Sequence, residues 1–292
     1  MFIYINGKIV KQEEAQISPF DHGYLYGLGV FETFRVYDGH PFLIDDHLMR
    51  LRVGLKELNI LFEYKRDEIL DIIDRILEAN GLRDAYIRFN VSAGQGEIGL
   101  QTEEYSQPTV IAFAKPVPKL VKQKQAVILK TPRNTPEGPF RLKSHHFLNS
   151  IYAKRELGND PAKEGILLTS EGYLSEGITS NLFWVKDNSF YTPSLDTGIL
   201  NGITRLYIKE VINQLGFSLY ESRYTVSELD KSDEIFITNS IQEIIPISRL
   251  NETALPGANG PLTTRLQKIY NIHRTKLWSR DDLKEREGFI EI

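Results

Sequence analysis

The chain has 292 residues, of which 41% are hydrophobic and 25% are charged, and its formal net charge is −4. This composition is typical of a soluble globular protein with enough apolar residues for two domains, and it gives no electrostatic reason to expect nucleic-acid binding. The absence of cysteine excludes disulfides, thiolate metal ligands and a cysteine nucleophile. Because the N-terminal residues lack a signal-peptide pattern and no apolar stretch reaches membrane-spanning length, we expect a cytoplasmic protein.

The N-terminal part predicts a mixture of strands and helices. Asn6-Gly7 and Asp38-Gly39 each lie between apolar runs and predict tight hairpin turns, because these residues tolerate positive φ. Asp45 is expected to cap a leucine-rich helix, and an isoleucine-rich helix is expected to stop at Asn80-Gly81. Two further strands are expected in this part, over residues 86–92 and 109–114.

Residues 115–119, Lys-Pro-Val-Pro-Lys, predict a linker, since two prolines oppose both a helix and a buried strand. We therefore expect a smaller N-terminal α/β domain over residues 1–115 and a larger C-terminal domain, carrying the candidate lysine described below, over residues 120–292. A helix is expected to open at Gly202 and another at Pro261. The remaining expectations are strands over residues 126–130, 165–169, 181–185 and 234–238, and a charged, solvated stretch over residues 280–287.

Lys143 and Glu176 are the two residues that suggest covalent carbonyl chemistry. A lysine condenses with an aldehyde only through its neutral amine, which burial and cationic neighbours favour. If the aldehyde is pyridoxal 5'-phosphate, a carboxylate must face the pyridine nitrogen and keep it protonated, so that the ring accepts electrons. Lys143 and Glu176 have the functional groups for these two tasks, although a lysine–glutamate pair of this spacing is weak evidence for such a site by itself.

A phosphate group needs backbone N–H donors, hydroxyl groups and usually an arginine. Gly202-Ile203-Thr204 offers unhindered amides and the Thr204 hydroxyl at an expected helix N-terminus. Ser240 follows an expected strand, and Arg50 lies off the apolar face of its helix. Each of these residues also has an ordinary interpretation, as a helix cap, a turn residue or a surface charge.

Three further side chains are candidates for contact with a substrate. Arg88 can hold a substrate carboxylate or form a buried ion pair, and Thr33 can face the substrate or be an ordinary strand threonine. His145 and His146 are adjacent on an expected strand, so their side chains point to opposite faces and do not readily share one metal ion. We expect no metal site, and we expect one of the two histidines, with His146 as the candidate, to line the cofactor pocket.

Taken in order along the chain, these motifs resemble the class IV aminotransferase-like proteins, which are the fold-type IV pyridoxal-phosphate enzymes. The resemblance extends from about Phe2 to Tyr270. It rests on Arg50, Lys143, Ser175-Glu176-Gly177, Gly202-Ile203-Thr204-Arg205, and Asn239-Ser240.

The resemblance implies a two-domain α/β (α+β) fold of the D-amino acid aminotransferase type, with the cofactor between the domains, and a homodimer. It also implies that Lys143 binds pyridoxal 5'-phosphate covalently and that Glu176 pairs with the pyridine nitrogen. The phosphate would be held by Arg50, Ile203, Thr204 and Ser240.

Within the family, three positions separate the subtypes. D-amino acid aminotransferases carry a tyrosine where this chain has Phe31 and an arginine where it has Ala93, and branched-chain aminotransferases carry a tyrosine where it has Leu148. The segment from Arg141 to Asn149 is instead similar to bacterial aminodeoxychorismate lyases. The expected reaction is therefore the conversion of 4-amino-4-deoxychorismate to 4-aminobenzoate and pyruvate for folate synthesis.

Three alternatives remain open. The nearest is a pyridoxal-phosphate aminotransferase acting on D-amino acids or branched-chain amino acids. The second is a cofactor-free aldolase that uses Lys143 directly, which leaves Arg50, Thr204 and Ser240 unexplained. The third is a non-catalytic binding protein on the same fold, which the intact lysine and glutamate oppose.

Overall fold

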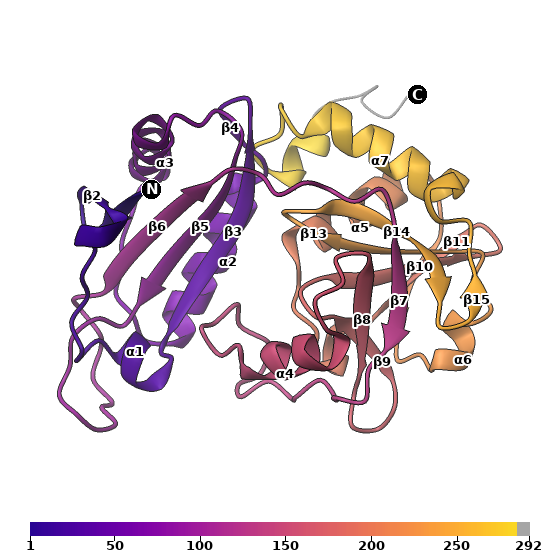
Figure 1. Cartoon of the computed structure of the whole chain (residues 1–292), viewed down its shortest axis with the longest axis horizontal. Helices are drawn as coiled ribbons and strands as arrows, with labels where there is room; N and C mark the ends of the chain where they lie inside the picture. Colours follow the sequence, from indigo (N-terminus) through magenta and orange to yellow (C-terminus); the bar gives the residue numbers. More distant parts are fainter. Residues whose placement is uncertain (285–292) are drawn as a thin grey trace. The chain divides into compact units, whose positions relative to one another are not determined.

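The computed structural model describes residues 1–284, and its backbone divides into two compact units (Figure 1). The first unit comprises residues 1–118, 142–146 and 274–279, and the second comprises, among the described residues, 119–141, 147–273 and 280–284. The chain thus first passes from one unit to the other between Pro118 and Lys119. Among the residues described, no helix is long and apolar enough to cross a membrane.

The first unit is built on a six-stranded antiparallel sheet. The predicted hairpin turns are confirmed: φ is 43° at Asn6 and 90° at Gly7, and 51° at Asp38 and 83° at Gly39. In sheet order, the strands are β2 (Lys8–Lys11), β1 (Phe2–Ile5), β6 (Thr109–Lys115), β5 (Ala85–Ser92), β3 (Gly29–Tyr37) and β4 (His40–Pro41). A short helix, α1 (His22–Tyr26), precedes β3.

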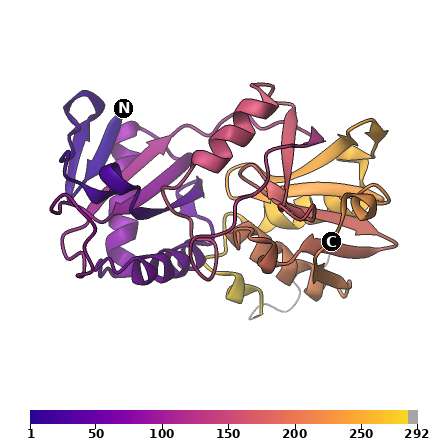
Figure 2. The same ribbon diagram turned by 90° about the horizontal axis from the view of Figure 1, so that it is seen from below.

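Two helices, α2 (Ile44–Glu57) and α3 (Arg66–Asn80), pack on this sheet and bury one of its faces (Figures 1 and 2). Phe34 of β3 and Phe89 of β5 belong to this core. Because neighbouring side chains of a strand point to opposite faces, Phe31 and Arg88 lie on the face that the helices leave uncovered. Thr33 is the direct partner of Arg88 across the two strands. The strand period therefore places Thr33 and Arg88, two of the predicted substrate residues, on one face.

The helix boundaries confirm one of two sequence predictions. The α3 helix ends at Asn80 with Gly81 in the left-handed conformation, as expected. The prediction that Asp45 caps α2 is wrong, because the helix already begins at Ile44 and its N-cap is Leu43, at φ 55°. The Asp45 carboxylate instead accepts a hydrogen bond from Arg66 Nε at 2.6 Å.

The second unit contains a nine-stranded mixed sheet with apolar side chains on both faces. Trp184 and Ile235 lie in a core on one face, and Phe183 and Phe236 stack on the other with ring centroids 5.2 Å apart. The path is β12 (Leu219–Ser222), β11 (Ser189–Pro193), β10 (Asn181–Lys186), β13 (Glu234–Asn239), β14 (Glu243–Leu250), β7 (Lys124–Ile128), β8 (Lys163–Leu168) and β9 (Leu174–Gly177), with β15 (Thr253–Ala254) paired to β14.

Three helices of the second unit pack against this sheet. They are α5 (Ile203–Gln214), α7 (Pro261–His273) and α4 (Leu148–Leu157), of which the first two open where Gly202 and Pro261 predicted. A short helix, α6 (Val226–Leu229), precedes β13. The charged C-terminal stretch begins with a 3-10 turn at Arg280–Leu283, and residues 285–287 of the expected solvated segment lie outside the described residues.

The segment that carries Lys143 groups with the first unit, although it lies within the range expected for the larger C-terminal domain. Phe31 N donates to Lys143 O at 2.9 Å and His145 N donates to Gly29 O at 3.0 Å. These bonds place residues 143–145 along the part of β3 that β4 does not cover, since β4 pairs only with Val36 and Tyr37. The backbone hydrogen bonds of the lysine segment therefore assign it to the first sheet.

Candidate active site

Lys143 lies in a group of basic side chains around the ring of Phe31 in the first unit. Its Nζ is 4.6 Å from the ring centroid, and Arg88 Cζ is 3.8 Å from the same centroid. The His145 ring stacks on Phe31 with centroids 6.1 Å apart. Lys143 and His145 are alternate residues of an extended segment, which places their side chains on the same side. The π-face of Phe31 thus attracts the cationic groups of two predicted site residues.

The histidine next to this ring is neutral at physiological pH. Burial, together with the positive charge of Arg88, lowers the pKa of His145 to about 4. Burial also lowers the pKa of Arg88, whose Nε donates to Asn90 Oδ1 at 2.9 Å. His146, the histidine predicted to line the pocket, is exposed, and its Nε2 lies 3.4 Å from the carbonyl oxygen of Tyr26. The structure thus places His145, and not His146, against Phe31.

Arg50 is fixed by two residues that the sequence reading did not single out. Its Nε and Nη2 donate to the two carboxylate oxygens of Glu32 at 2.7 and 2.6 Å, and His47 Nδ1 donates to Glu32 Oε2 at 2.7 Å. Burial alone raises the pKa of Glu32, but the charge of Arg50 and the hydrogen bonds from Arg50 and His47 outweigh it and lower the pKa to about 2. Burial lowers the pKa of His47. The arrangement holds the guanidinium in one orientation.

In the second unit, Glu176 is a buried carboxylate at the end of β9, with 4% of its surface exposed. Arg133 donates to Glu176 Oε1 from Nε at 2.9 Å and from Nη2 at 2.8 Å. The other oxygen, Oε2, accepts from Asn181 Nδ2 at 3.3 Å and from Leu200 N at 3.1 Å. These donors fix the plane of the Glu176 carboxylate, so a further hydrogen-bond donor can approach its oxygen atoms from only one direction.

Two arginines flank this carboxylate. Arg133 also donates from Nη1 to Asn149 Oδ1 at 2.9 Å, and Arg141 Nε lies 3.9 Å from Glu176 Oε1. Burial, together with the positive charge of Arg133, lowers the pKa of Arg141 to about 10. Sequence reasoning missed Arg133 because no motif surrounds it.

The N-terminus of α5 lies beside Glu176 in the same unit. Gly202 is its N-cap and makes no side-chain cap hydrogen bond, and the Oγ1 atom of Thr204 is 3.3 Å from Ser240 Oγ. Asn181 joins the two features, since it donates to Glu176 and, at 2.8 Å, to the carbonyl oxygen of Leu200. A Cβ atom at Gly202 would lie 2.1 Å from Asn181 Oδ1. Helix N-termini attract anions through their unpaired amides and dipole, so these residues of the second unit suit a ring nitrogen and a phosphate.

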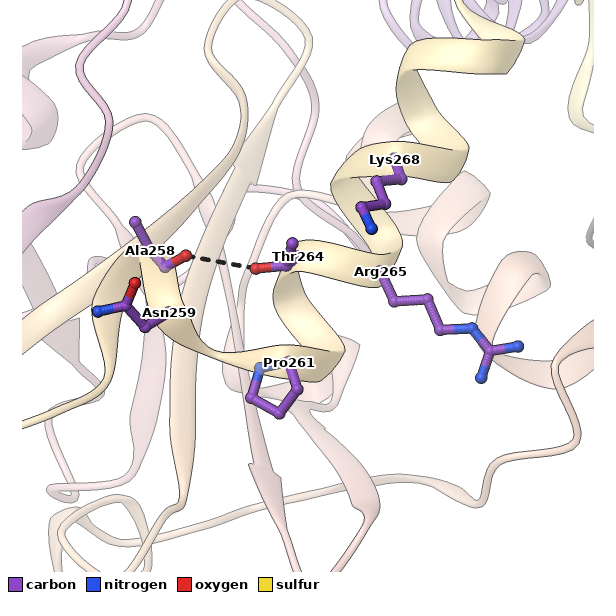
Figure 3. A pocket seen from close by; sticks show the side chains of 6 residues that line it. All are labelled: Ala258, Asn259, Pro261, Thr264, Arg265 and Lys268. Atoms are coloured by element: carbon purple, nitrogen blue, oxygen red, sulfur yellow. Dashed lines mark hydrogen bonds between the residues drawn. The ribbon is translucent and has the colours of Figure 1, made fainter. Parts of the chain in front are cut away.

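A separate hollow lies at the start of α7 (Figure 3). The first amides of this helix are already bound by Glu234, which accepts from Leu262 N at 3.0 Å and from Thr263 N at 2.8 Å. The amides of Leu262 and Thr263 are therefore not free to bind an anion in the hollow, which contains none of the predicted site residues. Its lining residues are Ala258, Asn259, Pro261, Thr264, Arg265 and Lys268. Within residues 1–284 the structure brings together no group of three or more histidine, aspartate or glutamate side chains that could hold a metal ion.

Comparison with known proteins identifies the family. The family model for class IV amino-transferases matches residues 29–250. The aminodeoxychorismate lyase of Bacillus subtilis (strain 168) is 48% identical over 272 residues, covering 92% of this chain and 93% of that protein. A putative branched-chain-amino-acid aminotransferase of Methanocaldococcus jannaschii is 35% identical over 280 residues, covering 94% and 97%.

The fold gives the same assignment. The structure of the Escherichia coli branched-chain amino acid aminotransferase superposes with a TM-score of 0.84 at 30% identity, covering 94% of each chain. This chain belongs to the class IV aminotransferase family. The predictions of the family, of its two-domain α/β fold and of pyridoxal 5'-phosphate as the cofactor are thereby confirmed.

Proposed function

We propose that this protein is an aminodeoxychorismate lyase, which uses pyridoxal 5'-phosphate to convert 4-amino-4-deoxychorismate to 4-aminobenzoate and pyruvate. The observation that carries this proposal is its 48% identity to the Bacillus subtilis lyase over 92% of the chain. The sequence around the lysine supports it, because the segment from Arg141 to Asn149 is similar to the lyases beyond the shared Lys143.

Lys143 is the residue that would bind the cofactor and then act as the base. When bound, pyridoxal phosphate supplies an aldehyde for the substrate amine and a ring that accepts the electrons of the broken C–H bond. With the cofactor bound, the Lys143 amine would remove the proton from the substrate carbon that bears nitrogen. Arg88, which lies over the same Phe31 ring as Lys143, supports this role, since a cationic neighbour favours the neutral amine.

Glu176 would hold the protonated pyridine nitrogen, and Arg133 orients it for that task. Its burial and its four donor contacts support the assignment, because a fixed carboxylate binds a ring N–H in one direction. The amides of Ile203 and Thr204 and the paired hydroxyl groups of Thr204 and Ser240 would bind the phosphate. Arg50, which Glu32 fixes, would add the positive charge.

The residues that separate the subtypes support the lyase. Phe31, Ala93 and Leu148 replace polar residues that transaminase subtypes carry, and apolar side chains do not supply hydrogen bonds to a substrate carboxylate. Arg88 and Thr33, which face each other across β5 and β3, are the proposed substrate contacts. Loss of pyruvate makes the substrate ring aromatic, so the reaction is strongly downhill and needs no second keto acid.

The second candidate function is an aminotransferase, favoured by the 35% identity to a protein named as a putative branched-chain-amino-acid aminotransferase. It would use the same cofactor contacts but return a proton to the cofactor and release a keto acid. The proposed homodimer and cytoplasmic location remain predictions, and gel filtration and cell fractionation would test them.

The test compares catalytic efficiencies for aminodeoxychorismate, D-alanine and leucine on one preparation, with pyruvate release followed without any added keto acid. We expect the lyase reaction to be much the fastest of the three. Transamination that outruns pyruvate release would contradict the lyase assignment and leave the cofactor assignment intact.

A further inference from the structure

The second unit contains a buried ion pair that the proposed chemistry does not use. Lys124 Nζ lies 2.8 Å from Glu164 Oε2, and each side chain is only 7% exposed. The two residues come from β7 and β8, which are neighbouring parallel strands. Burying two charges costs hydration energy, and an apolar pair of similar volume is often as stable. Stability alone therefore gives no reason for charges at these positions.

Lys124 reaches a turn that carries a proposed phosphate contact. Its Nζ donates to Gln242 Oε1 at 3.1 Å. The turn over residues 239–242 is closed by Asn239 Oδ1, which accepts from Ile241 N at 3.0 Å and from Gln242 N at 2.7 Å. Ser240 lies within this turn, with its Oγ 3.3 Å from Thr204 Oγ1. The Lys124 ammonium group is thus hydrogen-bonded directly to the turn that contains Ser240.

Glu164 reaches a second turn, which directly follows Glu176. Ser180 Oγ donates to Glu164 Oε1 at 3.2 Å, and Gly177 N donates to the carbonyl oxygen of Ser180 at 2.7 Å. A Cβ atom at Gly177 would lie 2.1 Å from Ser180 Oγ and 2.9 Å from Glu164 Oε1. This close approach means that a shift of Glu164 is transmitted to the turn and to the end of β9.

We propose that the Lys124–Glu164 pair positions the two turns that hold pyridoxal phosphate, and so fixes the ring-nitrogen contact at Glu176 relative to the phosphate contact at Ser240. The proposal rests on the cofactor contacts assigned under the proposed function. The ring nitrogen and the phosphate belong to one ligand, so both turns must be held at once for the two contacts to form together at full strength. A buried pair in which each partner hydrogen-bonds to one of the turns meets this need, and Lys124 and Glu164 are positioning residues in this sense.

The main test is the double variant Lys124→Met/Glu164→Leu. Removing both charges leaves no unpaired buried charge, so the fold is expected to persist, while Gln242 and Ser180 both lose their partner. The dissociation constants of the apoprotein for pyridoxal 5'-phosphate and for pyridoxine 5'-phosphate, which lacks the aldehyde, are measured by fluorescence titration. We expect both to rise roughly tenfold or more, as when a supporting hydrogen-bond partner of a ligand-binding group is lost. The far-ultraviolet circular dichroism of the apoprotein is expected to stay unchanged.

Three single variants sharpen the result. Lys124→Arg keeps the charge and should retain most of the affinity. Gln242→Leu releases only the turn of Ser240 and should weaken binding of pyridoxine 5'-phosphate without disturbing the ion pair. Lys186→Met is the control. Lys186, on β10 of the same sheet, forms an exposed ion pair in which its Nζ lies 3.1 Å from Asp233 Oδ1, and the substitution breaks this pair. We expect this variant to bind both ligands with the parental affinity.

Parental affinity in the double variant would overturn the positioning role and leave the pair a structural feature. If the double variant does not fold, Gln242→Leu decides the question, and parental affinity in that variant would overturn the proposal. A parent protein that binds neither ligand would instead refute the proposed cofactor contacts, and this inference would fail with them.

Discussion

The guanidinium of Arg50 and the carboxylate of Glu32 meet side by side, with two parallel hydrogen bonds of 2.7 and 2.6 Å. Glu32 is 1% exposed and also accepts a hydrogen bond from His47. A bidentate pair of this kind fixes both the position and the plane of the arginine. The proposed phosphate contact is therefore held in place by the protein before any ligand arrives.

This pair predicts a loss of stability in acid. The pKa of Glu32 is about 2 in the folded protein, below its ordinary value of 4.5. Its ionised form therefore stabilises the fold above pH 4.5, and this contribution, about 3 kcal/mol at most, is lost as the pH falls from 4.5 towards 2. The lowered pKa of His47 acts in the same direction, since protonation below pH 6.5 favours the unfolded chain.

The measurement is the free energy of unfolding by urea between pH 7 and pH 3 for the parent and for Glu32→Gln. The variant should be less stable at pH 7, and the difference between the two proteins should narrow as the pH falls. A difference that stays constant over this range would show that Glu32 does not titrate as described.

Lys143→Ala should abolish covalent attachment of the cofactor while the protein stays folded. The backbone of this segment makes its hydrogen bonds through Lys143 O and His145 N, which the substitution leaves in place. Borohydride reduction of the loaded parent followed by peptide mapping locates the modified lysine. Lys154→Ala, on α4, is the matched control and should still be labelled at Lys143. A label at any other lysine would refute the assignment.

Glu176→Gln should retain bound cofactor and lose most of the turnover rate. A neutral amide still accepts the hydrogen bonds of Arg133, but it cannot hold the proton on the pyridine nitrogen. The absorbance of bound cofactor and the kcat of Glu176→Gln are compared with those of Glu171→Gln. Glu171 is an exposed acid that precedes β9, the strand that contains Glu176. Turnover near the parental rate in Glu176→Gln would mean that another group faces the ring nitrogen.

Gly202→Ala should weaken cofactor binding on the order of tenfold, because the new methyl group would lie 2.1 Å from Asn181 Oδ1 and displace a side chain that contacts Glu176. The dissociation constant for pyridoxine 5'-phosphate measures the effect. In the Asn181→Ala background the clash is absent, so Gly202→Ala should then add little further loss. Equal losses in both backgrounds would assign the effect to the helix N-terminus itself.

Much of the fold was predictable where local chemistry decides the backbone. Asn6-Gly7 and Asp38-Gly39 form their turns, and Gly81 ends α3, because positive φ is cheap at these residues. The α4 helix had no such signal. It leaves Leu148 and Tyr152 exposed and buries only Ala153 among its residues, so its apolar residues show no helical period.

The residues of the candidate site also divide into those that local sequence motifs predict and those that only the tertiary structure brings in. Lys143, Glu176 and the start of α5 follow from motifs, whereas Arg133 meets Glu176 only through tertiary contact between distant segments. A weak signal existed for Glu32, since an acid within the largely apolar and buried strand β3 needs a buried partner. The choice between His145 and His146 depended on which side of the extended segment faces Phe31, and sequence alone does not give that orientation.

The pairing of residues 143–145 with β3 has a consequence for how the protein acquires its reactivity. During synthesis the six strands of the first sheet are complete by Lys115, before Lys143 has been made. The lysine segment must then close a long loop to reach Gly29 and Phe31, and such non-local contacts form slowly. A nascent chain that has folded its first sheet therefore still lacks its nucleophile. The protein can bind the cofactor covalently only after residues 143–145 have docked against β3.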